Sequence, residues 1–182
     1  MKNKNIRGSM TLEAAMVVPI FILLMLAVNG FFLMFMGQQV LSHTVIQSAK
    51  SMAYDPYASQ RVTADEGDQL ADMFVDLFSY ANGDFTSPEE WYEDGAFFSV
   101  SQVAEDRFFA FLGKKGSQAD TLLELVGVRG GHNGLDFSGC KVEDGVLTYK
   151  VTYTQEFPMT TADFTSFERE LAVQVKLFEY KN

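Results

Sequence analysis

The chain contains few of the side chains from which metal and redox sites are built, with one cysteine and two histidines in 182 residues. Cys140 has no second cysteine for an internal disulfide, and we predict a small buried side chain in preference to a bridge between two chains. His43 and His132 lie far apart in the sequence, so neither a zinc site nor a cysteine–histidine catalytic pair is expected. No combination of nucleophile, base and metal is recognisable. We therefore predict no enzymatic activity, no cofactor and no metal site.

Positive charge is scarce beyond the amino terminus. From Gln38 onward, 11 Lys and Arg stand against 23 Asp and Glu, a formal charge of −12. Because phosphate contacts require clustered cations, this composition excludes nucleic acid as a partner of that part of the chain. The glycine-rich segment Gly127–Gly134 lacks the Gly-Lys-Ser/Thr ending of a phosphate-binding loop. We interpret it as a linker between a helical part and a sheet.

One long apolar run is present, from Ala14 to Met36. A helix of this length would measure about 34 Å, enough to cross a bilayer core of about 30 Å. Cations precede the run at Lys2, Lys4 and Arg7, whereas the chain after it is acidic. The positive-inside tendency therefore predicts a single-pass protein of the cell membrane, with a cytoplasmic N-terminus and everything after Gly37 outside the cytoplasm.

The apolar run is longer than the roughly 7–15 residues of a secretory signal, and no small-residue cleavage site follows it closely. The nearest candidate, Ser51-Met52-Ala53, comes too late in the chain. We expect the helix to stay on the protein as an anchor, which leaves open a cut before it.

Glu13 stands at the edge of the apolar run. A carboxylate costs about 2.5–3.5 kcal/mol at the centre of a membrane and less near the interface. Either Glu13 stays hydrated at the depth of the lipid headgroups, or a positive charge pairs with it and offsets the cost. The residues around it bear on this choice.

The segment Arg7–Pro19 resembles the N-terminus of TadE-like pseudopilins, the type IV pilin-like proteins of the Tad (tight-adherence) pilus system. In that family a short basic leader ends in glycine, a glutamate is the fifth residue after it, and a proline follows six residues later inside an apolar run. Gly8, Glu13 and Pro19 occupy those places.

The resemblance implies that a prepilin peptidase cuts between Gly8 and Ser9, releasing a leader of residues 1–8. Glu13 would then pair with the new amine of Ser9, in its own or a neighbouring subunit. An opposite charge in a low-dielectric setting favours both ionised forms, so the pair would set register between subunits. At Pro19 a kink or local unwinding of the helix is expected.

The anchor helix is predicted to continue beyond the membrane, because Val40, Leu41, Val45 and Met52 lie near one helical face. Asp55-Pro56 should end it, since a residue before proline is pushed out of helical conformation. Four shorter helices follow from start and stop signals: one from Thr63 to Asn82-Gly83, one from Ser87-Pro88, one from Ser99 with Gln102 to Gly113, and one through Leu122 to Val126.

The C-terminal third alternates apolar and polar residues with a period of two. Strands are predicted at 135–142, 146–155 and 171–180, with a hairpin turn at Glu143-Asp144-Gly145. These strands would form an antiparallel sheet with one apolar face, packed on the first helix.

The predicted fold class is α+β and pilin-like. It comprises a leader (1–8), a transmembrane helix with its external extension (9–53), a helical part (54–134) and a sheet part of roughly three antiparallel strands (135–182). About 145 residues outside the membrane are enough for one core.

Two functions remain open. By the resemblance, the chain is a minor pseudopilin of a Tad-type pilus or related secretion assembly, at the base of the filament or within it. Its partners would be the bilayer, the prepilin peptidase, other pilin subunits and the assembly platform. Alternatively, it is an unprocessed single-pass protein with an extracellular binding module, which would tolerate Glu13→Ala.

Overall fold

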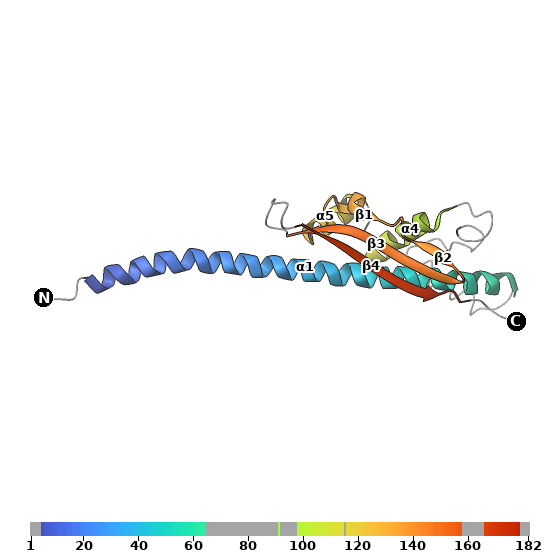
Figure 1. Ribbon diagram of the computed structural model, residues 1–182, viewed down its shortest axis with the longest axis horizontal. Helices are drawn as coiled ribbons and strands as arrows, with labels where there is room; N and C mark the ends of the chain where they lie inside the picture. The colour runs from blue at the N-terminus through green and yellow to red at the C-terminus, as the bar shows by residue number, and fades with distance from the viewer. Residues whose placement is uncertain (1–4, 65–90, 92–97, 115, 158–165, 179–182) are drawn as a thin grey trace.

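The structure, a computed structural model, describes residues 5–64, 91, 98–114, 116–157 and 166–178, with side chains from residue 13 onward and up to residue 57 in the first helix. It consists of one very long helix, α1 (Asn5–Ala64), and a smaller body packed against its C-terminal half (Figure 1). That body, residues 98–114, 116–157 and 166–178 with Trp91, is called the head below. The N-terminal half of α1 extends away from the head (Figure 1).

Helix α1 contains 60 residues and runs without a break through both Pro19 and Pro56. The local unwinding predicted at Pro19 is therefore absent. The prediction that Asp55-Pro56 ends the helix is wrong, because α1 continues to Ala64. Asp55 and Pro56 are both buried against the head, and this packing outweighs the local preference against helix before proline.

Two of the shorter predicted helices are confirmed. Helix α4 (Val100–Leu112) begins with a capping box in which Ser99 accepts from the N–H of Gln102, and it ends at Gly113 in the left-handed conformation. Helix α5 (Ser117–Leu125) ends one residue before Val126. The helices predicted from Thr63 and Ser87 fall mainly outside the described residues, although Thr63 itself belongs to α1.

The sheet is antiparallel, as predicted, and centres on β3 (Val146–Glu156). Strand β4 (Ser166–Lys176) pairs along the whole of one edge of β3. Two short strands, β1 (Leu135–Asp136) and β2 (Lys141–Glu143), pair with different parts of the other edge. The β2–β3 hairpin turns at Asp144-Gly145, and both residues have positive φ, which matches a type I′ turn.

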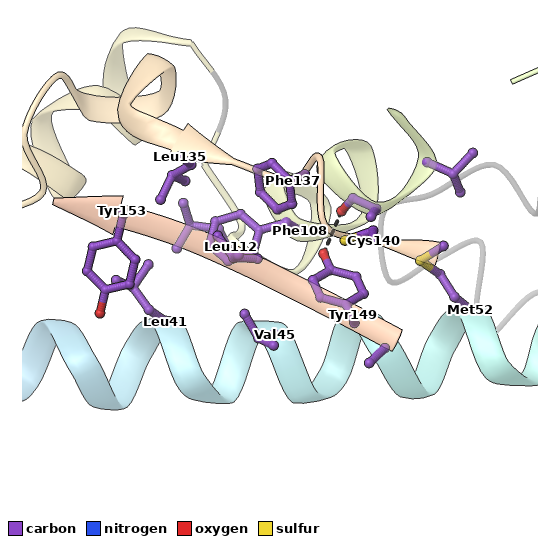
Figure 2. Close-up of a cluster of buried hydrophobic side chains, with 14 of the residues drawn as sticks. Leu41, Val45, Met52, Phe108, Leu112, Leu135, Phe137, Cys140, Tyr149 and Tyr153 are labelled. Atoms are coloured by element: carbon purple, nitrogen blue, oxygen red, sulfur yellow. Dashed lines mark hydrogen bonds between the residues drawn. The ribbon is translucent and has the colours of Figure 1, made fainter. Parts of the chain in front are cut away.

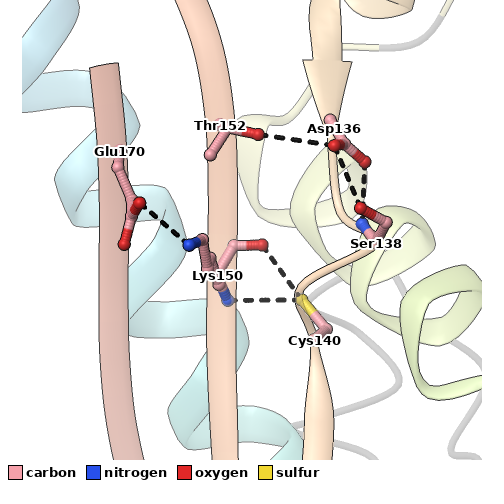
Figure 3. A network of polar contacts seen from close by, with 6 residues as sticks. All are labelled: Asp136, Ser138, Cys140, Lys150, Thr152 and Glu170. Carbon is pink, nitrogen blue, oxygen red and sulfur yellow. Dashed lines mark hydrogen bonds and ion pairs between the residues drawn. The ribbon is translucent and has the colours of Figure 1, made fainter. Parts of the chain in front are cut away.

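The sequence prediction of one strand over 135–142 is only partly correct, because residues 137–140 leave the ladder. Asp136 accepts from the backbone N–H and the hydroxyl of Ser138 (Figure 3). Cys140 N–H donates to Phe137 O. This turn buries Phe137 between β1 and β2. The third predicted strand begins five residues earlier than expected, at Ser166, and ends at Lys176.

The core lies between α1, α4 and the sheet (Figure 2). Alternate residues of β3 are buried, from Leu147 to Gln155, as the period of two predicts. Tyr149 reaches from the sheet to α4, where its hydroxyl donates to Ala104 O at 2.6 Å. The predicted α+β class and the packing of the sheet on the first helix are confirmed.

Between α5 and the sheet, the glycine-rich segment lies where a linker was predicted, and it includes the 3-10 turn η1 (Gly131–Gly134). Arg129 N–H donates to Thr154 O, and Glu156 N–H donates to Gly127 O. These bonds tie the segment to the end of β3.

Candidate functional site

The N-terminal half of α1 presents an uncovered apolar surface. From Ala14 to Asn29 every side chain is exposed except Ala27, which is half-buried. By length and composition α1 is able to cross a membrane, and it is the one such helix among the described residues. An apolar surface of this size requires lipid or other apolar helices around it.

From Gly30 onward, one face of α1 is covered by the head. Its buried residues recur at spacings of three and four, so that positions seven apart coincide on one stripe. The stripe comprises Gly30, Met34, Gly37, Leu41, Thr44, Val45, Ser48, Ala49, Ser51, Met52, Ala53, Asp55 and Pro56. The predicted face is thereby confirmed for Leu41, Val45 and Met52, while Val40 is half-buried at its side.

Two glycines allow the head to approach α1 closely. A Cβ built on Gly30 would overlap Phe157 Cζ, and one on Gly37 would lie 2.6 Å from Val126 Cβ. Both contacts are closer than two carbon atoms tolerate, so a methyl group at either position would require Phe157 or Val126 to move. The ring of Phe157 also meets Phe31 edge-on, with centroids 5.3 Å apart.

Gln155 bridges α1 and the head between these glycines. Its buried amide nitrogen donates to Met34 O at 3.2 Å and to Val126 O at 3.5 Å, and its oxygen accepts from Gln38 at 3.0 Å. The side chain is fully buried and its polar atoms are paired, as burial requires. It therefore fixes the height of the head along α1.

Farther along, a buried ion pair joins α1 to α4. The Arg107 guanidinium donates to both carboxylate oxygens of Asp55, at 3.0 and 3.2 Å, and to the hydroxyl of Ser51 at 2.5 Å. Trp91 contributes a further side-chain hydrogen bond to Asp55. Burial raises the pKa of Asp55 to about 7, and the charge and hydrogen bonds of Arg107 oppose that rise.

The predicted site residues all lie on α1, away from the head. Gly8 and Ser9 belong to its first two turns, Glu13 is exposed where the apolar run begins, and Pro19 is exposed within the run. The structure brings none of these residues into contact with the head residues that it describes. Any partner of this region is therefore outside the described fold.

Cys140 and the histidines do not form a common site. Cys140 is buried, as predicted; its thiol donates to Lys150 O and accepts from Lys150 N–H (Figure 3), and burial raises the pKa of the thiol. His132 contacts Asp120, and the pKa of Asp120 is lowered mainly by the backbone hydrogen bond from His132. Among the described residues no group of three potential metal ligands occurs.

Sequence reasoning missed Gln155 and Arg107 as contact residues. Each nevertheless leaves a signal. Gln155 continues the inward-facing series of β3 as its single polar member. Arg107 stands four residues after Val103 on the apolar face of α4, where a charge calls for a partner across the interface.

The N-terminal half of α1 is apolar and exposed, and its C-terminal half is covered by the head. This arrangement is typical of a membrane-anchored protein. Residues 8–50 match the family model of the TadE-like proteins. The match confirms the resemblance drawn from Arg7–Pro19 and indicates a component associated with the Tad pilus. It ends within α1, so the head lies beyond it. No curated protein and no solved structure matches the chain significantly.

Proposed function

We propose that this chain is a minor pseudopilin-like structural subunit of a Tad-type pilus or a related secretion assembly. The observation that carries the proposal is the uncovered apolar half of α1, which lies within the TadE-like segment 8–50. Other apolar helices would cover this surface in an assembly, while the bilayer covers it before assembly. The role is structural, and the proposal needs no catalytic group, cofactor or metal.

The cations before the apolar run are expected to hold the N-terminus in the cytoplasm, which would put the head outside. A prepilin peptidase then cuts between Gly8 and Ser9 at the cytoplasmic face, which removes the first residues of α1 and leaves its apolar run intact. The new amine of Ser9 lies four residues before Glu13, so both groups share one helical face. Glu13 can pair with this amine in its own subunit or in a neighbour.

Glu13 sets the register of the assembling helices in this mechanism. An unpaired carboxylate is costly among apolar helices, and a nearby ammonium group offsets that cost only when the subunits are correctly aligned. Pro19 leaves the carbonyl of Ala15 without its helical donor, which makes this turn the place where α1 can bend as helices bundle. The remaining partners are the other pilin subunits and the assembly platform.

Processing is tested by the intact mass and N-terminal sequence of the protein extracted from the membranes of its native cells. We expect a chain that begins at Ser9, and a Gly8→Ala variant that retains Met1. A wild-type chain that still begins at Met1 would contradict processing and favour the unprocessed membrane-anchored binding module.

Assembly is tested in the same cells with Glu13→Ala, which should be cut normally but incorporated poorly. Loss of one charge pair worth about 1.4 kcal/mol would lower incorporation about tenfold. Glu105→Ala, which removes an exposed carboxylate from α4, is the matched control and should assemble like the wild type. Normal assembly by both Gly8→Ala and Glu13→Ala would overturn the proposal.

A further inference from the structure

The head covers α1 from a point inside the apolar run. The uncovered stretch Ala14–Asn29 holds 16 residues, about 24 Å of helix. A bilayer core about 30 Å thick needs about 20 residues, which would end at Leu33 if Ala14 lay at the cytoplasmic boundary. The head already contacts α1 at Gly30. The free stretch is therefore about 6 Å too short to span the core alone.

Simple rearrangements do not remove this shortfall. Tilting α1 shortens its projection on the membrane normal and so draws the head closer to the lipid. Sliding the helix outward would pull Glu13 into the core at an energetic cost. The least costly arrangement leaves Glu13 at its interface and brings the nearest end of the head into the opposite one.

Among the described residues, five exposed apolar side chains lie near the end of the head that faces the membrane. Three exposed phenylalanines of α1, Phe31, Phe32 and Phe35, lie at this level, together with Leu125 of α5 and Phe167 of β4; all five are 49–69% exposed. These five residues are called the apolar rim below.

Register and packing place the two head residues of the rim at this level. Phe167 pairs with Gln155, whose amide reaches Met34. Leu125 immediately precedes Val126, which packs on Gly37. Both residues therefore lie close to the outer end of the apolar run.

We propose that the apolar rim inserts into the interface of the leaflet on the head's side, so that the head rests on the bilayer. The occupant is lipid because the three phenylalanines continue the apolar run of α1, and Leu125 and Phe167 lie at the level of its outer end. A depth of about 6 Å at Gly30 lies within the range of interfacial segments. This inference rests on membrane anchoring alone and goes beyond the pilus role. It holds whether or not the leader is cut.

Charges of both signs lie beside the rim, where Glu124 and Glu168 are also exposed. Arg129 pairs with Glu156 at 3.2 Å beside the end of β3, and the Arg169 guanidinium lies 5.9 Å from the centre of the Phe167 ring. The head is acidic overall. Rim insertion is therefore driven by apolar contact, and it does not require anionic lipid.

The test uses the full-length chain in phosphatidylcholine vesicles that contain nitroxide-labelled lipids, with the nitroxide near the top of the acyl chain. A bimane fluorophore is attached at Phe167→Cys or Leu125→Cys in a Cys140→Ala background. Lys176→Cys is the matched control, because Lys176 is exposed on the same strand as Phe167, about 30 Å away along β4. Emission from Trp91, the one tryptophan of the chain, verifies folding in every variant.

We expect several-fold stronger quenching at positions 167 and 125 than at 176, unchanged when anionic lipid is added. Quenching at 167 and 125 as weak as at 176, in variants whose Trp91 emission is native, would overturn the proposal. Bimane emission could instead indicate a rim shielded from water only at high protein-to-lipid ratio, with no quenching by the labelled lipid. That result would also overturn the proposal and would identify a second copy of the chain as the occupant. Protein that begins at Met1 would leave the expected quenching unchanged, so this test is distinguishable from that of processing.

Discussion

At the scale of single residues, the contact between α1 and α4 depends on a charge pair in a nearly dry interface. Asp55 and Arg107 are 3% and 5% exposed, so both have lost most of their hydration. Such a pair contributes little net stability compared with well-packed apolar residues. Removal of one partner, however, leaves the other charge buried without a counter-charge. The pair therefore selects one alignment of α1 on the head, because a shifted helix would leave both charges unpaired.

This argument predicts that Arg107→Met destabilises the head by about 3–5 kcal/mol, because the Asp55 carboxyl keeps its burial and loses its counter-charge. The measurement is urea unfolding of the detergent-solubilised full chain, followed by Trp91 emission. Arg169→Met, which removes an exposed arginine, should change the unfolding free energy by less than about 0.5 kcal/mol.

The double variant Arg107→Met with Asp55→Leu should regain much of the stability lost in the single variant, because no charge then remains buried. A double variant less stable than Arg107→Met would show that the ion pair itself, rather than an unpaired Asp55 carboxylate, accounts for the lost free energy of unfolding.

At the scale of elements, the sequence predicts what is decided by neighbouring residues. The capping box of Ser99 and Gln102, the Asp144-Gly145 turn and the alternation along β3 all follow from local conformational preferences. The passage of α1 through Pro56 and the break in the strand over 135–142 do not. Both depend on distant partners, the head around Asp55 in one case and the burial of Phe137 in the other, which no local pattern reveals.

For the glycines of α1, substitution by alanine should change stability in the direction opposite to that expected from helix propensity. Alanine in place of a mid-helix glycine should stabilise a free helix by about 1 kcal/mol. Gly37→Ala should instead loosen the head, because the added methyl group meets Val126 Cβ and its backbone carbonyl. Gly30→Ala should cost less, since the nearest atoms belong to the Phe157 ring, which is able to rotate.

Urea unfolding of the detergent-solubilised chain measures both variants, and Gln39→Ala, an exposed neighbour on α1, is the control. A Gly37→Ala variant more stable than the wild type would contradict the close approach of Val126 to α1.

At the scale of the whole molecule, one continuous helix joins the membrane to the head. The head is tied to α1 near Gly30 by Phe157 and near Ala53 by Phe178, whose N–H donates to Ala53 O. The apolar run and the flanking cations predict an anchor. They do not predict that its last turns belong to the head, because helix faces against lipid and against a protein core are equally apolar. Only the fold divides the run at Gly30.

That division yields a prediction about length. Inserting seven apolar residues between Leu26 and Ala27 turns the helix by only about 20° from its original phase and adds about 10 Å. The free stretch then reaches 23 residues, about 34 Å, which spans a bilayer core of about 30 Å by itself. The head should rise, and lipid quenching at Phe167→Cys should fall to the level at Lys176→Cys. Replacing Phe21–Ala27 with the same seven residues keeps the length and should preserve the quenching. Full quenching after the insertion would contradict the length argument and would mean that the affinity of the rim for lipid, rather than the length of α1, sets the depth of the head.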